Sequence, residues 1–134
     1  FPTLSNYQPI QNKISELETQ LPKQNYFKRG QNHLIIMATP DSPYFNSILD
    51  FLTTVQKSDL QIDLVLPHLP LSQTQLLTNG LPKNINILSD PDGDIALLFP
   101  VVSNPQFMLI DRQNKLRYLF STLPTAAELD KLDL

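Results

Sequence analysis

Three side chains that could do chemistry lie within four residues of one another, at Asp41, Ser42 and Tyr44. They follow the apolar run 34–38 and precede a helical pattern, so we place them in a turn between a strand and a helix. The carboxylate of Asp41 could act as an acid or base, bind an arginine or lysine of a partner, or cap the following helix. Because aspartate is a preferred capping residue, we expect capping. The ring of Tyr44 could line a groove or pack with its hydroxyl in water.

A second group of carboxylates, Asp90, Asp92 and Asp94, has the spacing with which a calcium-binding loop begins. That motif needs glycine where this chain has Ile95 and glutamate where it has Val101. We therefore interpret the segment as a turn followed by the start of a helix, and we predict no metal site there.

The other candidates for catalysis or metal binding are isolated. His33 and His68 stand apart in the sequence, with no third zinc ligand evident. Ser42 lacks the glycine-rich elbow of a serine hydrolase, and the three glycines of the chain form no phosphate-binding loop. The chain has no cysteine, which excludes disulfides, thiolate metal sites and thiol redox chemistry. We predict neither a cofactor nor a metal.

Size and charge limit the partners. At 134 residues the chain is long enough for one domain with a substantial core. Its net charge is −3 and its basic residues are scattered, with only Lys28 and Arg29 adjacent, so nucleic acid is not an expected partner. No apolar run is long enough to span a membrane.

The hydrophobic pattern places these residues on alternating elements. It predicts strands over 34–38, 62–66, 85–88, 107–110 and 115–120, and helices over 9–21, 44–57, 71–78, 92–99 and from Thr125 onward. Thr125 and Glu128 have the spacing of a capping box. Helices between the first strands and a closing hairpin imply an α/β fold with a mixed sheet and helices on both faces.

Two apolar stripes need a partner surface. The helix over 9–21 carries a narrow stripe that packs on its own domain, on a partner or on a second copy of the chain; we favour packing on the domain. The region 67–82 is rich in leucine, and we expect its five leucines to cover the sheet: Leu69, Leu71, Leu76, Leu77 and Leu81.

Several segments resemble the active-site region of thioredoxin-like proteins, especially the branch related to TlpA and the peroxiredoxins. Residues 38–40, Ala-Thr-Pro, stand where that family often has Ala-Thr-Trp, and residues 41–44, Asp-Ser-Pro-Tyr, stand where it has Cys-x-Pro-Cys. Residues 89–94 match its loop containing Asp-Pro-Asp-Gly. Residues 101–118 match its later segment, with Pro105 at the position of the family's cis-proline.

The resemblance implies a thioredoxin-like domain over residues 26–134, with a central mixed sheet flanked by helices. Residues 1–25, with the helix that the apolar spacing predicts, then form an N-terminal extension. The resemblance also implies that Pro105 follows a cis peptide bond and that the backbone of Asn104 can pair with an extended peptide. The peptide-binding groove that it implies is formed by seven residues: Asp41, Ser42, Pro43, Tyr44, Asn104, Pro105 and Gln106.

Both cysteine positions of that motif are changed, to Asp41 and Tyr44. Neither side chain can exchange with a disulfide, so reductase, oxidase and cysteine-peroxidase activities are excluded for this chain. Engineered removal of native thiols usually leaves serine or alanine, which argues against that origin.

We therefore expect a non-catalytic module for protein interaction or assembly, and family analogy favours a periplasmic or secreted setting in the bacterial envelope. Two alternatives stay open. One is an enzyme with non-thiol chemistry at Asp41 and Tyr44. The other is a structural subunit held in an assembly, with partners or with further copies of itself, by its N-terminal helix.

Overall fold

A computed structural model describes residues 26–28, 30–55, 59–99 and 103–131 of the chain. The helix predicted over 9–21, and with it the N-terminal extension, lies outside the described residues. Within the described part, no helix combines the length and the apolar character needed to cross a membrane.

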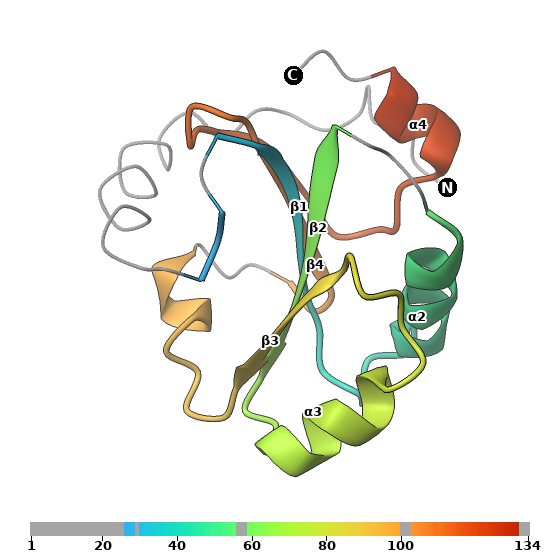
Figure 1. Cartoon of the computed structure of the whole chain (residues 1–134), viewed down its shortest axis with the longest axis vertical. Coiled ribbons are helices and arrows are strands. Elements are labelled where there is room, and N and C mark those ends of the chain that lie inside the picture. The colour runs from blue at the N-terminus through green and yellow to red at the C-terminus, as the bar shows by residue number, and fades with distance from the viewer. Residues whose placement is uncertain (1–25, 29, 56–58, 100–102, 132–134) are drawn as a thin grey trace.

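A five-stranded mixed sheet forms the centre of the domain (Figure 1). Its strands are β1 (Asn32–Met37), β2 (Leu60–Pro67), β3 (Asn86–Asp90), β4 (Gln106–Ile110) and β5 (Leu116–Phe120). They lie in the order β3-β2-β1-β4-β5; β1, β2 and β3 are parallel, and β4 runs antiparallel to both β1 and β5. The predicted mixed sheet is confirmed, and both ends of every predicted strand lie within two residues of the ends of the observed strand.

Strand β1 lies in the middle of the sheet and is buried along its whole length. Successive side chains point to opposite faces, so Leu34 and Ile36 belong to one hydrophobic core and Ile35 and Met37 to the other. A strand that is buried on both faces consists of a continuous run of apolar residues, which is why the sequence pattern identifies it.

Helical segments cover both cores (Figure 1). They are α2 (Phe45–Thr54), α3 (Leu71–Thr78), the 3-10 helix η3 (Ala96–Leu98) and α4 (Ala126–Asp130). Helices α2 and α4 cover the first core through Ile48, Leu52 and Leu129. Ile95 and Phe99, which flank η3, cover the second.

The starts of the helices test the capping predictions. The capping box at α4 is confirmed, since the hydroxyl of Thr125 accepts the N–H of Glu128 and the Glu128 carboxylate accepts the N–H of Thr125. The helix predicted over 92–99 is wrong in extent, because only η3 forms. The buried carboxylate of Asp90 accepts the N–H groups of Ile95 and Ala96, both at 3.0 Å, so the helical turn begins later than predicted.

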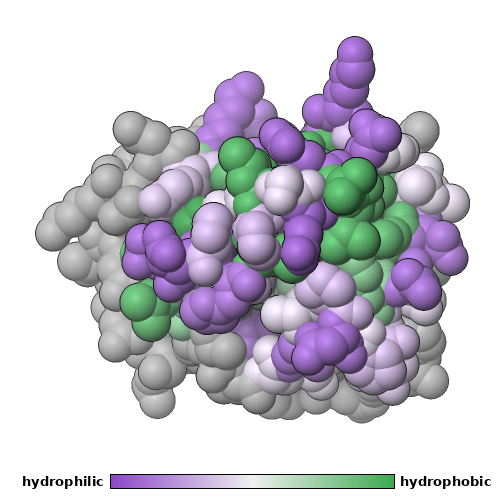
Figure 2. Space-filling model, turned by 90° about the horizontal axis from the view of Figure 1, so that it is seen from below, coloured by the Kyte–Doolittle hydropathy of each residue, from purple (hydrophilic) through white to green (hydrophobic). Residues whose placement is uncertain are grey.

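The leucine-rich region covers the sheet only in part. Leu69 is buried and Leu81 packs against the first core, but α3 buries Thr74 and Thr78 instead of its leucines. Figure 2, which views the end of the molecule where α3 lies, shows hydrophobic surface between hydrophilic residues. The prediction is therefore wrong for three leucines of α3, which are exposed: Leu71 (56%), Leu76 (79%) and Leu77 (38%).

A buried polar cluster lies at the opposite end of β1 from the predicted turn. The Nδ1 of His33 lies 2.7 Å from the Asp63 carboxylate on β2, and its Nε2 faces the backbone carbonyl of Lys28. Asn86 on β3 donates to the other carboxylate oxygen of Asp63 (2.9 Å) and to the carbonyl of Tyr26 (3.1 Å). The cluster therefore joins three strands to the segment that precedes β1.

The same contacts shift the titration of the pair. Burial lowers the pKa of His33, but the hydrogen bond to Asp63, the attraction of its carboxylate and the Lys28 carbonyl together raise it above the ordinary 6.5. Burial raises the pKa of the Asp63 carboxyl above its ordinary 3.8, against the opposing contacts with His33 and Asn86. In both groups the folded state holds the proton more tightly than the unfolded state does.

We predict that the free energy of unfolding falls as the pH rises. The contribution of His33 is fully present below its unfolded pKa of 6.5 and is lost as the pH passes its raised folded pKa. Denaturant unfolding across neutral to alkaline pH should show this decline, and His33→Gln should flatten it. Asp63→Asn should also flatten it, at a cost of about 3–5 kcal/mol. Asp50→Asn, on the exposed side of α2, should keep it; an undiminished decline in His33→Gln would contradict the assignment.

Candidate functional site

The two segments that the sequence singled out meet at one end of the sheet. Strand β1 ends at Met37, which pairs with Gln106 at the start of β4. The turn over 38–44 therefore leaves β1 beside the loop that enters β4. In that loop the peptide bond between Asn104 and Pro105 is cis.

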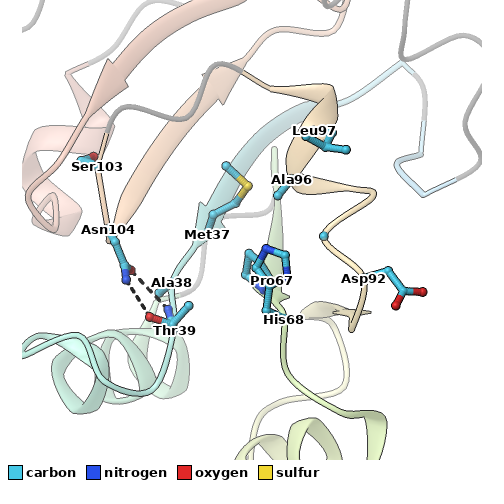
Figure 3. A pocket seen from close by; sticks show the side chains of 11 residues that line it. Met37, Ala38, Thr39, Pro67, His68, Asp92, Ala96, Leu97, Ser103 and Asn104 are labelled. Atoms are coloured by element: carbon cyan, nitrogen blue, oxygen red, sulfur yellow. Dashed lines mark hydrogen bonds between the residues drawn. The ribbon is translucent and has the colours of Figure 1, made fainter.

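The side-chain amide of Asn104 ties the loop to the turn (Figure 3). Its Oδ1 accepts the backbone N–H of Thr39 at 3.2 Å, and its Nδ2 donates to the Thr39 hydroxyl oxygen at 2.6 Å. The Thr39 hydroxyl donates in turn to the carboxylate of Asp41. A continuous chain of hydrogen bonds thus runs from the loop before β4 into the turn after β1.

Asp41 does not cap helix α2, and that prediction is wrong. The helix begins at Phe45, and the capping position is Tyr44, which makes no side-chain capping bond. The backbone needs two tight turns first, in which Ser42 N–H donates to the Thr39 carbonyl (3.0 Å) and Phe45 N–H donates to the Ser42 carbonyl (3.1 Å). Asp41 lies within the first of these turns, where its carboxylate accepts a hydrogen bond from the Thr39 hydroxyl.

The seven predicted groove residues lie together at this end of the sheet but divide by burial. Ser42 is 8% exposed and Gln106 is fully buried, so neither presents its side chain to a partner. The Ser42 hydroxyl accepts the Tyr44 N–H (3.4 Å), which supports the turn. Pro105 is buried as well. The side chains that reach the surface belong to the other four residues: Asp41, Pro43, Tyr44 and Asn104.

The buried residues hold the loop that carries Asn104. The Gln106 side-chain carbonyl accepts the N–H of Ser103 (3.3 Å), and the Ser103 hydroxyl donates to the carbonyl of Pro105 (2.9 Å). Together with the bonds of Asn104 to Thr39, these contacts fix the loop on both sides of the cis bond. Gln106 and Ser42 are therefore positioning residues for the candidate site.

Sequence reasoning missed a pocket beside the turn. It has a volume of about 410 Å³, and it is lined by the end of β1, by Pro67 and His68 after β2, by Ala96 and Leu97 of η3, and by the loop carrying Asn104 (Figure 3). No local pattern could have found it, because its walls come from four segments that only the sheet order brings together. The sequence feature nearest to the pocket is Thr39, the polar residue that follows the buried strand.

The carboxylates and histidines at this end do not converge. Asp90 is buried and faces the N–H groups near η3, whereas Asp92 and Asp94 are exposed. Among the described residues, no group of three or more histidine, aspartate or glutamate side chains lies close enough to hold a metal ion.

Solved structures with the same arrangement are thioredoxin-like proteins. Mycobacterium tuberculosis DsbF superposes with a TM-score of 0.63 at 19% identity, over 75% of this chain and 77% of that chain. A secreted disulfide oxidoreductase of the same organism gives 0.64 at 16% identity, over 78% and 84% of the two chains. StoA from Bacillus subtilis gives 0.61 at 15% identity, over 78% and 83%.

These similarities establish the thioredoxin-like fold and no more, because the identities are low. No protein-family model matches the sequence, and no curated protein matches it. The chain differs from the disulfide oxidoreductases in its site, since it contains no cysteine anywhere. The chain has a thioredoxin-like fold, and Asp41 and Tyr44 lie in the turn between β1 and α2.

We predict that Asn104 and Thr39 are energetically coupled. Asn104→Ala removes two hydrogen bonds and should lower the free energy of unfolding by about 1–3 kcal/mol, since each bond contributes about 0.5–1.5 kcal/mol. Thr39→Val removes the hydroxyl, and urea unfolding of both single variants and the double variant gives the coupling energy, expected at about 0.5 kcal/mol or more. Asn79→Ala, after α3, is a control that should change stability by less than about 0.5 kcal/mol. Strict additivity of the two variants would contradict the bridge.

Proposed function

We propose that this domain is a redox-inactive binding module that holds an extended segment of a protein partner between the turn at 39–44 and Asn104. The observation that carries the proposal is the hydrogen bonding of Asn104. Its side chain is hydrogen-bonded to Thr39, while its backbone N–H and C=O form no hydrogen bond with any described residue. A peptide laid beside this loop could pair with both groups, as in strand addition.

The exposed side chains of the turn support the same proposal. Tyr44 is 57% exposed and stands at the head of α2, with Pro43 beside it. Tyrosine combines a large apolar surface with a polar tip and few rotatable bonds, and it is enriched among the residues that dominate binding energy. Asp41 adds a carboxylate that could pair with a cation of the partner.

The lack of cysteine supports a binding role over a catalytic one. Disulfide exchange needs a thiolate, and the chain supplies none. Asp41 is exposed and already accepts a hydrogen bond from Thr39, so the site offers no enclosed acid or base at Asp41 and Tyr44. We therefore favour an accessory or assembly role over an enzyme with non-thiol chemistry.

We further propose that the domain works in the bacterial envelope. The support is indirect: one structural neighbour is described as a secreted disulfide oxidoreductase, and another as a pneumococcal exposed lipoprotein thioredoxin. The second has a TM-score of 0.55 at 16% identity. Fractionation of the native cells with an antibody against the domain tests this setting.

We predict that the intact chain selects peptides from a displayed library of random linear sequences. Binding of an enriched peptide, measured by fluorescence anisotropy, should weaken about tenfold or more in Tyr44→Ala, since buried tyrosines at interfaces often contribute at least about 2 kcal/mol. Leu76→Ala is the matched control, because Leu76 is also an exposed large side chain but lies on α3.

Two results would contradict the proposal. One is a library from which the folded chain enriches no peptide. The other is binding that survives Tyr44→Ala and is lost in Leu76→Ala, which would move the interface to α3.

A further inference from the structure

The pocket beside the turn is apolar inside and open to solvent. Met37 and Ala38, at the end of β1, are 4% and 2% exposed and form its floor, and Ala96 and Leu97 form one side (Figure 3). Its volume of about 410 Å³ lies within the range of about 300–1,000 Å³ found for ligand pockets. Leu97 stands at the rim and is 78% exposed, an apolar surface that the domain itself leaves uncovered.

The wall formed by His68 is fixed by two contacts. His68 has a positive φ of 59°, and its N–H donates to the carbonyl of Asp90 at 2.7 Å. Its ring packs directly on Gly93, where a Cβ atom would lie only 2.4 Å from the ring. A side chain at Gly93 would therefore displace the ring, and glycine there keeps this wall in place.

The opposite wall is fixed as well. The Asp90 carboxylate holds the N–H groups of Ile95 and Ala96, which sets the position of η3. Because Asp90 also accepts the His68 N–H through its backbone, one residue positions both walls. The cavity is thus preformed, and a preformed cavity lowers the ordering cost of binding.

The charge at the mouth of the pocket is negative. Asp92 lies on the rim with its carboxylate directed outward (Figure 3), and the exposed Asp94 follows two residues later. None of the described lysines and arginines lines the pocket. Arg112 lies at the other end of β1, where its N–H donates to Asn32. Since no lysine or arginine in the described ranges forms an ion pair with Asp92 or Asp94, a cationic group of a partner would meet negative charge here.

The pocket and the proposed groove share two residues, Thr39 and Asn104. A peptide that pairs with the Asn104 backbone passes the mouth of the pocket, and alternate side chains of an extended peptide point to the same side. From this geometry we infer that the pocket receives one large apolar side chain of the partner segment, and that a lysine or arginine next to it pairs with Asp92. The inference rests on the proposed function and specifies the class of peptide sequence that the groove prefers.

The sequences of the enriched peptides test the inference. We expect one position rich in leucine, isoleucine, methionine or phenylalanine, with lysine or arginine within two residues of it. In an enriched peptide, replacing the apolar residue with serine should weaken binding about tenfold or more. This test leaves the domain itself unchanged. Ala96→Phe, which fills the cavity, should do the same if it folds.

A charge reversal tests the role of Asp92. Asp92→Lys should weaken binding of the basic peptide and strengthen binding of the same peptide with glutamate in place of the cation. Asp50→Lys makes the same change in net charge on α2 and should leave both affinities unchanged within about twofold.

The outcomes separate the two proposals. Binding that needs Tyr44 but tolerates both the serine peptide and Asp92→Lys would overturn the pocket inference and leave the groove standing. Enrichment of acidic peptides would overturn the inference in the same way. Failure to enrich any peptide would overturn both.

Discussion

The hydrogen bonds of the Asn104 side chain are the contact on which the candidate site depends. β1 is buried on both faces and cannot shift, so the turn that leaves it starts from a fixed point. Asn104 uses both ends of its amide on Thr39, and this joins the loop before β4 to that turn. The backbone N–H and C=O of Asn104 form no hydrogen bond with a described residue. Asn104 thus joins the two segments of the candidate site through its side chain, and its backbone is the part that we propose pairs with a peptide.

Much of the fold could be predicted because its elements carry strong local signals. The run Leu34–Ala38 marks the central strand, and the Thr125 and Glu128 pair marks the start of α4 by a reciprocal bond that needs no tertiary contact. The loop before β4 could be placed only through resemblance to a known family, since a proline before an apolar strand has several local meanings. The seven residues of the predicted groove lie together at one end of the sheet, but their individual burial was not evident from the sequence.

Two of the predictions that failed met a competing hydrogen bond. Asp41 has the local character of a cap, but the Thr39 hydroxyl, itself held by Asn104, takes its carboxylate. The segment after Asp90 has the character of a longer helix, but the Asp90 carboxylate holds N–H groups five and six residues later. The leucines of α3 have the character of a core, but the helix turns two threonines inward instead. The pocket has no local signal, because four distant segments build it.

The chain has a thioredoxin-like fold and no cysteine, and we propose that the end of the sheet that carries Asn104 and Tyr44 binds an extended peptide. The crystal structure of the domain with an enriched peptide tests it most directly. We expect a peptide whose backbone pairs with the N–H and C=O of Asn104, with Tyr44 against it and an apolar side chain above Met37. A peptide bound instead on α3, over Leu71, Leu76 and Leu77, would contradict the proposed groove.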